Sequence, residues 1–100
     1  MTIHYTPTLE DYMRKTGKRD IAVEVVSSNS SDFEVTELHI HFVSDKQSAF
    51  FREKKGYRAV ETPLGSVLLP PYRLEYGETV TFELKSFLGI KHLKCKGIKL

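Results

Sequence analysis

Two histidines one residue apart, His39 and His41, have the spacing in this chain that best suits chemistry. Alternate residues of a β-strand share a face, which places the two rings about 7 Å apart, a separation that a metal site can use. Such a site needs at least a third ligand. The candidates are Glu37, His4 and His92, which the fold would have to bring to the pair.

The apolar residues around these histidines favour another interpretation. Leu38, Ile40 and Phe42 recur with the period of two that is typical of a half-buried strand. If these three side chains face the core, His39 and His41 face solvent. We therefore expect no metal at this pair and no cofactor in the chain.

No other group of residues predicts catalysis. The sequence contains no nucleophile elbow, phosphate-binding glycine loop or zinc-protease motif. The neighbouring carboxylates Glu10 and Asp11 suit the first turn of a helix, and Asp32 and Glu34 suit the solvated entrance of a strand. We expect that the protein is not an enzyme and has no catalytic residues.

The single cysteine, Cys95, fits the same conclusion. In a strand it points the same way as Leu93 and away from the lysines beside it, so those charges are poorly placed to activate the thiol. One thiol also excludes an internal disulfide. We expect Cys95 to be an inert packing residue.

Aromatic and basic residues gather between positions 49 and 58. We interpret residues 49–61 as a hairpin that turns at residues 53–56, because Gly56 suits a backbone position with positive φ. A helix over residues 45–55 is the alternative, since Ser44 and Asp45 can cap its start and Gly56 can close it.

This segment is also our predicted interaction site. Neighbouring residues of a strand point to opposite sides, so one of the two adjacent phenylalanine rings should lie outside, next to an arginine or tyrosine. Exposed aromatic rings beside arginine are common anchors of protein interfaces. The predicted partner-binding residues are Phe50, Phe51, Arg52, Tyr57 and Arg58.

Length and composition bound the class of protein. The chain has 100 residues, 40% of them hydrophobic, enough for one domain spanning 1–100 with one core. No apolar run approaches the roughly 18 residues of a transmembrane helix. The N-terminus lacks the layout of a signal peptide. We expect a cytoplasmic protein without a membrane partner.

The formal net charge of +2 is unevenly distributed. Residues 85–100 contain five lysines and no acidic residue. Lysines can keep an edge strand from pairing with other chains, and they can also form a contact for a polyanion or an acidic partner.

The clearest strand signal lies at residues 79–84, where Val80, Phe82 and Leu84 alternate with polar residues. Similar patterns predict about seven short strands in total. An apolar pattern that shifts by one position near Thr36–Glu37 predicts a β-bulge. The last strand is expected to bend at Gly97. A short helix is expected from a Thr8 cap to Gly17, with Leu9, Tyr12 and Met13 on one face.

Strands of this length, with turns every eight to twelve residues, resemble those of immunoglobulin-like and fibronectin-type modules, and the Pro70–Leu84 passage looks like their late strands. The resemblance implies an all-β, antiparallel β-sandwich that serves in binding or assembly. We therefore expect a non-enzymatic protein-interaction or structural module that binds a protein partner or a second copy of itself. A nucleic-acid-binding domain that uses the basic-aromatic hairpin and the lysine-rich C-terminus is the alternative.

Overall fold

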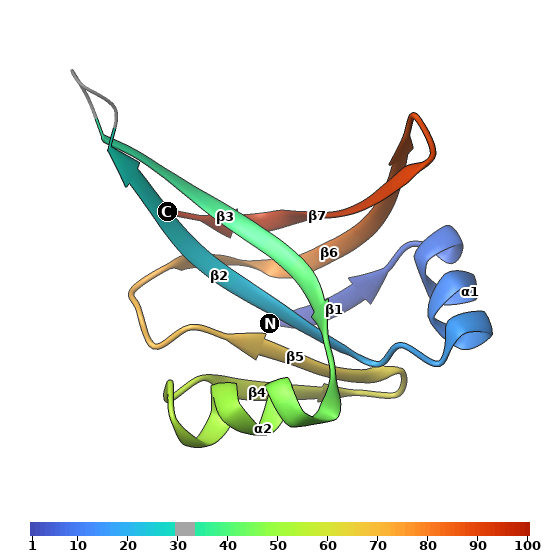
Figure 1. Ribbon diagram of the computed structural model, residues 1–100, viewed down its shortest axis with the longest axis horizontal. Helices are drawn as coiled ribbons and strands as arrows, with labels where there is room; N and C mark the ends of the chain where they lie inside the picture. The colour runs from blue at the N-terminus through green and yellow to red at the C-terminus, as the bar shows by residue number, and fades with distance from the viewer. Residues whose placement is uncertain (30–33) are drawn as a thin grey trace.

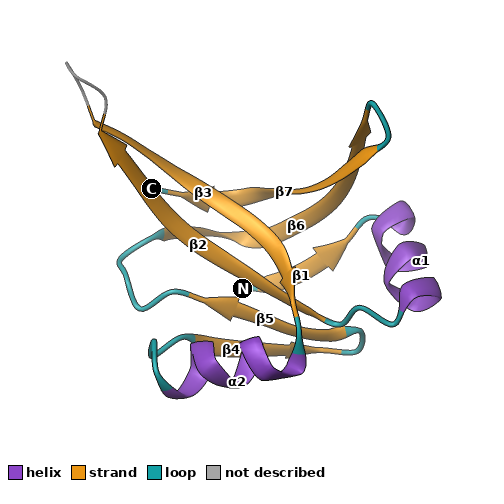
Figure 2. Ribbon diagram, in the orientation of Figure 1, coloured by secondary structure: helices purple, strands orange, loops and turns teal. Residues whose placement is uncertain are grey.

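The computed structural model describes residues 1–29 and 34–100, with side chains for residues 1–27 and 36–100. Two helices, α1 (Pro7–Thr16) and α2 (Asp45–Glu53), are set among strands. The strands are β1 (Thr2–Tyr5), β2 (Asp20–Asn29), β3 (Glu34–Val43), β4 (Arg58–Thr62), β5 (Gly65–Leu69), β6 (Glu75–Phe87) and β7 (Ile90–Lys99) (Figures 1 and 2).

The strands form two sheets, and the expected β-rich class is confirmed. One sheet has the order β1-β6-β7 and the other β3-β2-β5-β4. The expectation of purely antiparallel pairing is wrong, because β1 pairs with β6 and β2 pairs with β5 in parallel. In both cases the paired strands are far apart in the sequence. A long connection that contains at least one helix joins them, as parallel pairing requires. The immunoglobulin-like arrangement is not confirmed.

A core between the two sheets holds the molecule together. Phe82 and Val80 from one sheet and Ile21, Val23 and Val67 from the other are fully buried in it. The alternation predicted for residues 79–84 is confirmed, since Leu84 packs against the same core while the intervening residues face outward.

Helix α1 covers one end of this core. Leu9 and Met13 are buried in it, and Tyr12 lies half-buried on the same face. Gly17 ends the helix in the left-handed conformation, at φ 73°, as expected. The expected cap is displaced: Pro7 is the first helical residue and Thr6 takes the N-cap position without a side-chain hydrogen bond.

The first strand of the predicted hairpin is wrong, because the alternative helix is present there as α2, whereas the expected returning strand is present as β4. The Ser44 hydroxyl accepts a hydrogen bond from the Gln47 amide, and the Gln47 side chain accepts one from the Ser44 amide. This capping box satisfies two donors that the helix start otherwise leaves free. The cap thus outweighs the strand propensity of the two phenylalanines that follow.

A second, smaller core lies between α2 and the sheet that contains β2. Ala22, Val43 and Leu68 point to this face of the sheet, and Phe51 and Tyr57 cover them. The rings of Phe51 and Tyr57 meet edge to face, with centroids 4.7 Å apart. Strand β5 is therefore buried on both faces, which its short apolar sequence allows.

The bulge expected near Thr36–Glu37 is also wrong. Strands β2 and β3 pair in one unbroken antiparallel register from Asp20–Val43 to Asn29–Glu34. Phe33, which suggested the shift, lies outside the described residues. The expected irregularity at Gly97 is present, because the register of β6 and β7 shifts between Tyr76 and Thr81. A Cβ atom at Gly97 would lie 2.4 Å from the Thr79 carbonyl oxygen, so this close approach requires glycine.

No helix in the described part of the chain is long and apolar enough to cross a membrane.

Candidate functional site

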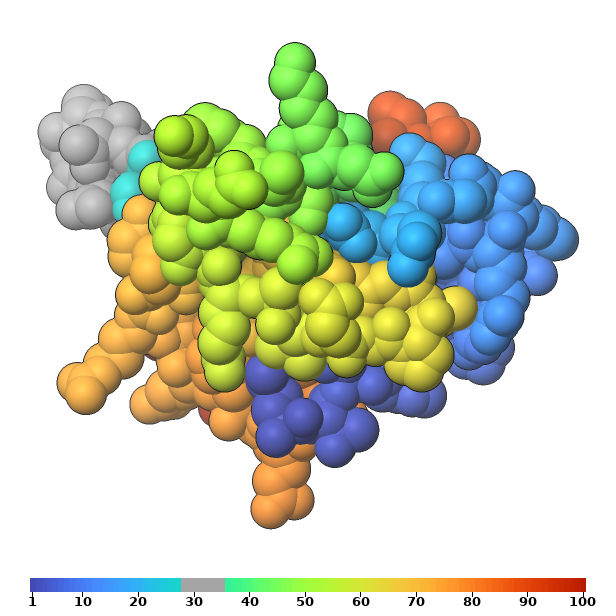
Figure 3. All heavy atoms as spheres, turned by 90° about the horizontal axis from the view of Figure 1, so that it is seen from below, coloured from blue at the N-terminus to red at the C-terminus, as the bar shows by residue number. Residues whose placement is uncertain are grey.

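The two sheets meet closely along one side of the molecule. There Tyr5, at the end of β1, lies near the turn between β4 and β5, and its hydroxyl is 3.0 Å from the Thr62 hydroxyl. Figure 3 looks onto this side and shows the N-terminal residues, in blue, directly against the yellow residues of β4 and β5. We call it the closed side.

The opposite side is open. Strands β3 and β7 are the last strands of their sheets, so each has one backbone edge that no other described strand pairs with. The β2–β3 and β6–β7 hairpins diverge toward their tips (Figure 1). Two hollows of about 460 and 590 Å³ lie between these strands and share Ile40, His41, His92 and Leu93. Together we call them the β3–β7 groove.

Aliphatic side chains form the floor of this groove. Leu38 and Ile40 from β3 and Leu84 and Leu93 from β6 and β7 line it, and all four are half-buried against the inter-sheet core. These residues lie at alternate positions of their strands. The spacing suits the alternate side chains of an extended chain laid beside them.

Two aromatic rings and two lysines form one end of the groove. The rings of Tyr12 and Phe42 have centroids 6.0 Å apart. The Lys91 ammonium lies 5.4 Å from the centre of the Tyr12 ring, and the Lys18 ammonium lies 5.5 Å from that of Phe42. Each ring face therefore has a cation beside it.

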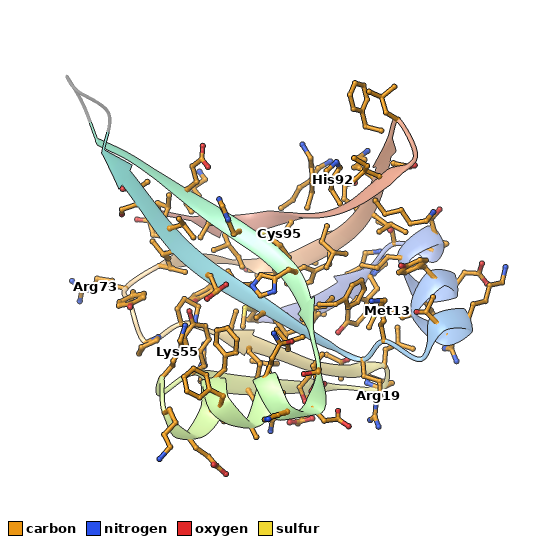
Figure 4. The ribbon with its side chains drawn as sticks, viewed as in Figure 1. Met13, Arg19, Lys55, Arg73, His92 and Cys95 are labelled. Carbon is orange, nitrogen blue, oxygen red and sulfur yellow. The ribbon has the colours of Figure 1, made fainter. Side chains whose placement is uncertain are left out.

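The charge around the groove is mostly positive. Glu37 is the one acidic residue among those that line it, and its carboxylate lies 3.3 Å from His39. Among the described residues, none of the ion pairs involves Lys18, Lys91 or Lys94. The three lysines can thus attract an anionic ligand without first breaking an ion pair. Figure 4 shows His92 in the same stretch of β7.

The histidine pair has the orientation that the sequence predicted. His39 and His41 lie opposite the core-facing residues of β3, and each contacts a carboxylate. Within residues 1–29 and 34–100 no three histidine, cysteine or acidic side chains are grouped to hold a metal ion. The expectation that this pair binds no metal stays a prediction.

Cys95 is half-buried on β7 and packs against the inter-sheet core (Figure 4). Burial raises the pKa of its thiol. The reactive thiolate is therefore disfavoured, in agreement with a packing role.

The five predicted partner-binding residues do not share one surface. Phe50 is 51% exposed, whereas Phe51 is 6% exposed in the second core. One ring thus points outward as predicted, although a helix rather than a strand places it there. Tyr57 is also buried. This burial, and to a lesser extent the negative charge of Glu24, raises the pKa of Tyr57 to about 12.

The two arginines of the predicted site point elsewhere. Arg52 donates hydrogen bonds to Ser48, Ser66 and Glu61, which ties α2 to strands β4 and β5. Arg58 lies beside Tyr76, where its charge opposes the rise in pKa that burial gives this tyrosine. Both side chains therefore have partners within the fold.

Phe50 contributes to a separate hollow of about 440 Å³ beside α2. Lys55 lies over Phe51 and Phe50, 4.8 and 5.8 Å from their ring centres, and 3.6 Å from a Glu24 oxygen (Figure 4). This hollow keeps Phe50 as a candidate contact. Its charges, unlike those of the groove, largely pair with each other.

The sequence alone did not identify the groove residues Tyr12, Lys18 and Phe42. They belong to a helix, a loop and a strand that only the fold brings together. The signal that was visible is the lysine-rich C-terminal segment, since β7 is an edge strand and forms one wall.

Comparison of this chain with protein-family models, with curated proteins and with solved structures finds no match. The assignment of function therefore rests on the geometry described above.

Proposed function

We propose that the protein is a non-enzymatic protein-interaction module that binds an extended, acidic segment of a partner protein in the β3–β7 groove. The observation that carries the proposal is the open side itself, which has an aliphatic floor and, within the described residues, two strand edges without a neighbouring strand and lysines that form no ion pair. A structural or assembly role is consistent with the same contact.

The backbone of β7 supplies the first element of recognition. A free strand edge offers amide and carbonyl groups to which an extended peptide can add as a further strand. Strand β7 has ten residues, enough for such pairing along most of a peptide of similar length. Lys94 would then lie beside the outward-facing acidic residues of the added strand, where opposite charges across a pair are favourable. Lys91, on the groove face of β7, would lie beside an acidic residue at the Tyr12 end of the groove.

The groove floor supplies the second element. Every other side chain of an added strand would point toward Ile40 and Leu93, while those between would point to the lysine-lined rim. The preferred segment therefore alternates apolar and acidic residues. The charges of Lys18, Lys91 and Lys94 should favour this segment over one that has basic residues in place of the acidic ones.

The same features favour a peptide over a single-stranded nucleic acid, which is the second candidate. Nucleic-acid grooves of this kind combine positive charge with ring faces on which bases stack. In this groove the faces of Tyr12 and Phe42 carry the ammonium groups of Lys91 and Lys18, and the remaining floor is aliphatic.

Selection of binders from random peptides of about ten residues, followed by a binding titration with a labelled selected peptide, tests the proposal. We expect the selected peptides to alternate acidic and apolar residues. The double variant Lys18→Glu/Lys91→Glu should weaken the best peptide at least roughly tenfold, since each unfavourable charge contact contributes about 0.5–1 kcal/mol or more.

The matched control is Lys46→Glu/Lys54→Glu. It makes the same charge change at two exposed lysines, one in α2 and one directly after it. It should bind as the wild type does. N-methylation of alternate peptide amides should abolish binding if the backbone pairs with β7. Equal loss in both double variants, or binding only to an oligothymidine with a steep salt dependence, would contradict the proposal.

A further inference from the structure

The tip of the β6–β7 hairpin exposes three large apolar side chains. Phe87 is 68%, Leu88 85% and Ile90 62% exposed, and they surround Gly89 at the end of the hairpin farthest from the core. The described fold covers none of them, and Figure 1 shows the tip projecting beyond the sheets. Isolated surface apolar residues are ordinary, but three at one tip mark a contact.

The backbone of the tip is arranged at some cost. Leu88 has φ 51° and Gly89 has φ 79°, the pair of positive values that a two-residue type I′ turn requires. Glycine accepts this conformation, and asparagine tolerates it better than leucine does. Among the described residues, Leu88 is the one non-glycine residue with positive φ. An unfavourable residue at the most exposed position indicates that its side chain has a role there.

Positive charge surrounds the tip on the same face of the sheet. Phe87 pairs with Ile90, Lys85 with His92, Glu83 with Lys94 and Thr81 with Lys96, so these residues share the outward face. The one acidic residue among them, Glu83, already lies 3.7 Å from Lys85.

We infer that this face binds an anionic lipid surface, with Phe87, Leu88 and Ile90 entering the interface and Lys85, Lys94 and Lys96 contacting the headgroups. Apolar side chains ringed by cations are the pattern of proteins that lie on such membranes without crossing them. The aliphatic Leu88 and Ile90 offer no stacking face for a nucleic-acid base.

This inference departs from the expectation of no membrane partner, which no observation of the structure tests. That expectation rested on the lack of spanning segments, which surface binding does not need. Lys94 belongs to both surfaces, whereas Phe87, Leu88 and Ile90 belong to the lipid face alone and Lys18 and Lys91 to the groove alone. Substitutions at these five residues can therefore separate lipid binding from peptide binding.

A single tryptophan at the tip provides a direct test, because the chain contains none. In Phe87→Trp, emission should shift to the blue with phosphatidylcholine vesicles that contain about a third phosphatidylserine. It should not shift with phosphatidylcholine alone. The matched control Tyr72→Trp, at an exposed ring in the connection between β5 and β6, should not shift with either.

Vesicle sedimentation of the otherwise unaltered protein gives the second readout. Leu88→Asn suits the turn, so it should fold with an unchanged or raised melting temperature while losing at least roughly tenfold in bound fraction at limiting lipid. Wild-type sedimentation with anionic vesicles that Leu88→Asn and added salt both reduce would support the inference. Failure of the wild type to sediment, an equal shift in Tyr72→Trp, or a shift only with oligothymidine would overturn it.

Discussion

The two sides of the sheet pair differ in what their residues do. On the closed side Tyr5, Thr62 and the β4–β5 turn direct their polar groups toward each other, so the contacts there hold the sheets together. On the open side, a groove lies between the edges of β3 and β7 and beside Lys18 and Lys91. These groups contribute little to holding the two sheets together. The difference indicates that substitutions on the closed side act on stability, while those on the open side act on binding.

The largest effect is expected where both sides depend on one residue. Phe82 is fully buried between the sheets, and its ring packs 6.2 Å, centre to centre, from that of Tyr5. Phe82→Ala should destabilise the protein by about 3–5 kcal/mol through lost transfer energy and the remaining cavity. Urea unfolding measures this loss, and an unchanged midpoint would show that the assigned core face is wrong.

A glycine pair compares the two sides directly. At Gly65, the first residue of β5 on the closed side, an added Cβ would lie 1.9 Å from the Arg19 carbonyl oxygen. At Gly89, in the β6–β7 turn, it would meet nothing within 4 Å. Gly65→Ala should therefore cost about 1–3 kcal/mol more than Gly89→Ala, whose cost comes from φ alone. Thermal melts of the two variants check this, and equal midpoints would contradict the difference between the sides.

The contrast between strand β6 and helix α2 shows where prediction from sequence succeeds and where it fails. Val80, Phe82 and Leu84 were predictable because strand alternation is a local signal that burial on one face reinforces. The segment around Phe50 was misread because its helix depends on a reciprocal cap between Ser44 and Gln47. Two aromatic residues in a row are typical of a strand, and it is the cap that favours a helix at this position.

The candidate groove was less predictable than the core for a physical reason. Its walls, β3 and β7, belong to different sheets and do not pair with each other. Only the packing of the two sheets brings them together, and such packing leaves no short-range pattern in the sequence. The lysines of β7 were visible as a charge bias, but Tyr12 and Phe42 had no property that set them apart from core residues.

A smaller loss is expected from one hydroxyl group on the closed side. Tyr5→Phe removes the hydrogen bond to Thr62 and should cost about 1 kcal/mol near neutral pH. Burial raises the pKa of Tyr5 above its usual 10.0. Its neutral form is thus favoured in the fold, and the stability linked to it is complete below pH 10 and is lost as pH rises above that value.

Unfolding at a series of pH values from neutral to alkaline measures both effects of this variant. The stability difference between wild type and Tyr5→Phe should shrink above pH 10, because only the wild type must ionise this ring. Tyr57 and Tyr76 are present in both proteins, so their own titration cancels in the comparison. A difference that stays constant or grows above pH 10 would show that the Tyr5 hydroxyl is not buried as described.

The smallest effect on stability, and the clearest separation of the two sides, is expected for Lys18→Gln. The ammonium of Lys18 contacts the exposed part of the Phe42 ring, a contribution of about 0.5–1 kcal/mol at most at such sites, and glutamine keeps part of the packing. The melting temperature should therefore stay close to that of the wild type. Affinity for the selected acidic peptide should fall several-fold, because one of three lysine charges at the groove is removed. Lys46→Gln, which removes the same charge beside α2, should leave both quantities unchanged. If Lys18→Gln instead lowered stability as much as Tyr5→Phe and left peptide affinity intact, Lys18 would belong to the fold rather than to the groove, and the open side would have no binding role.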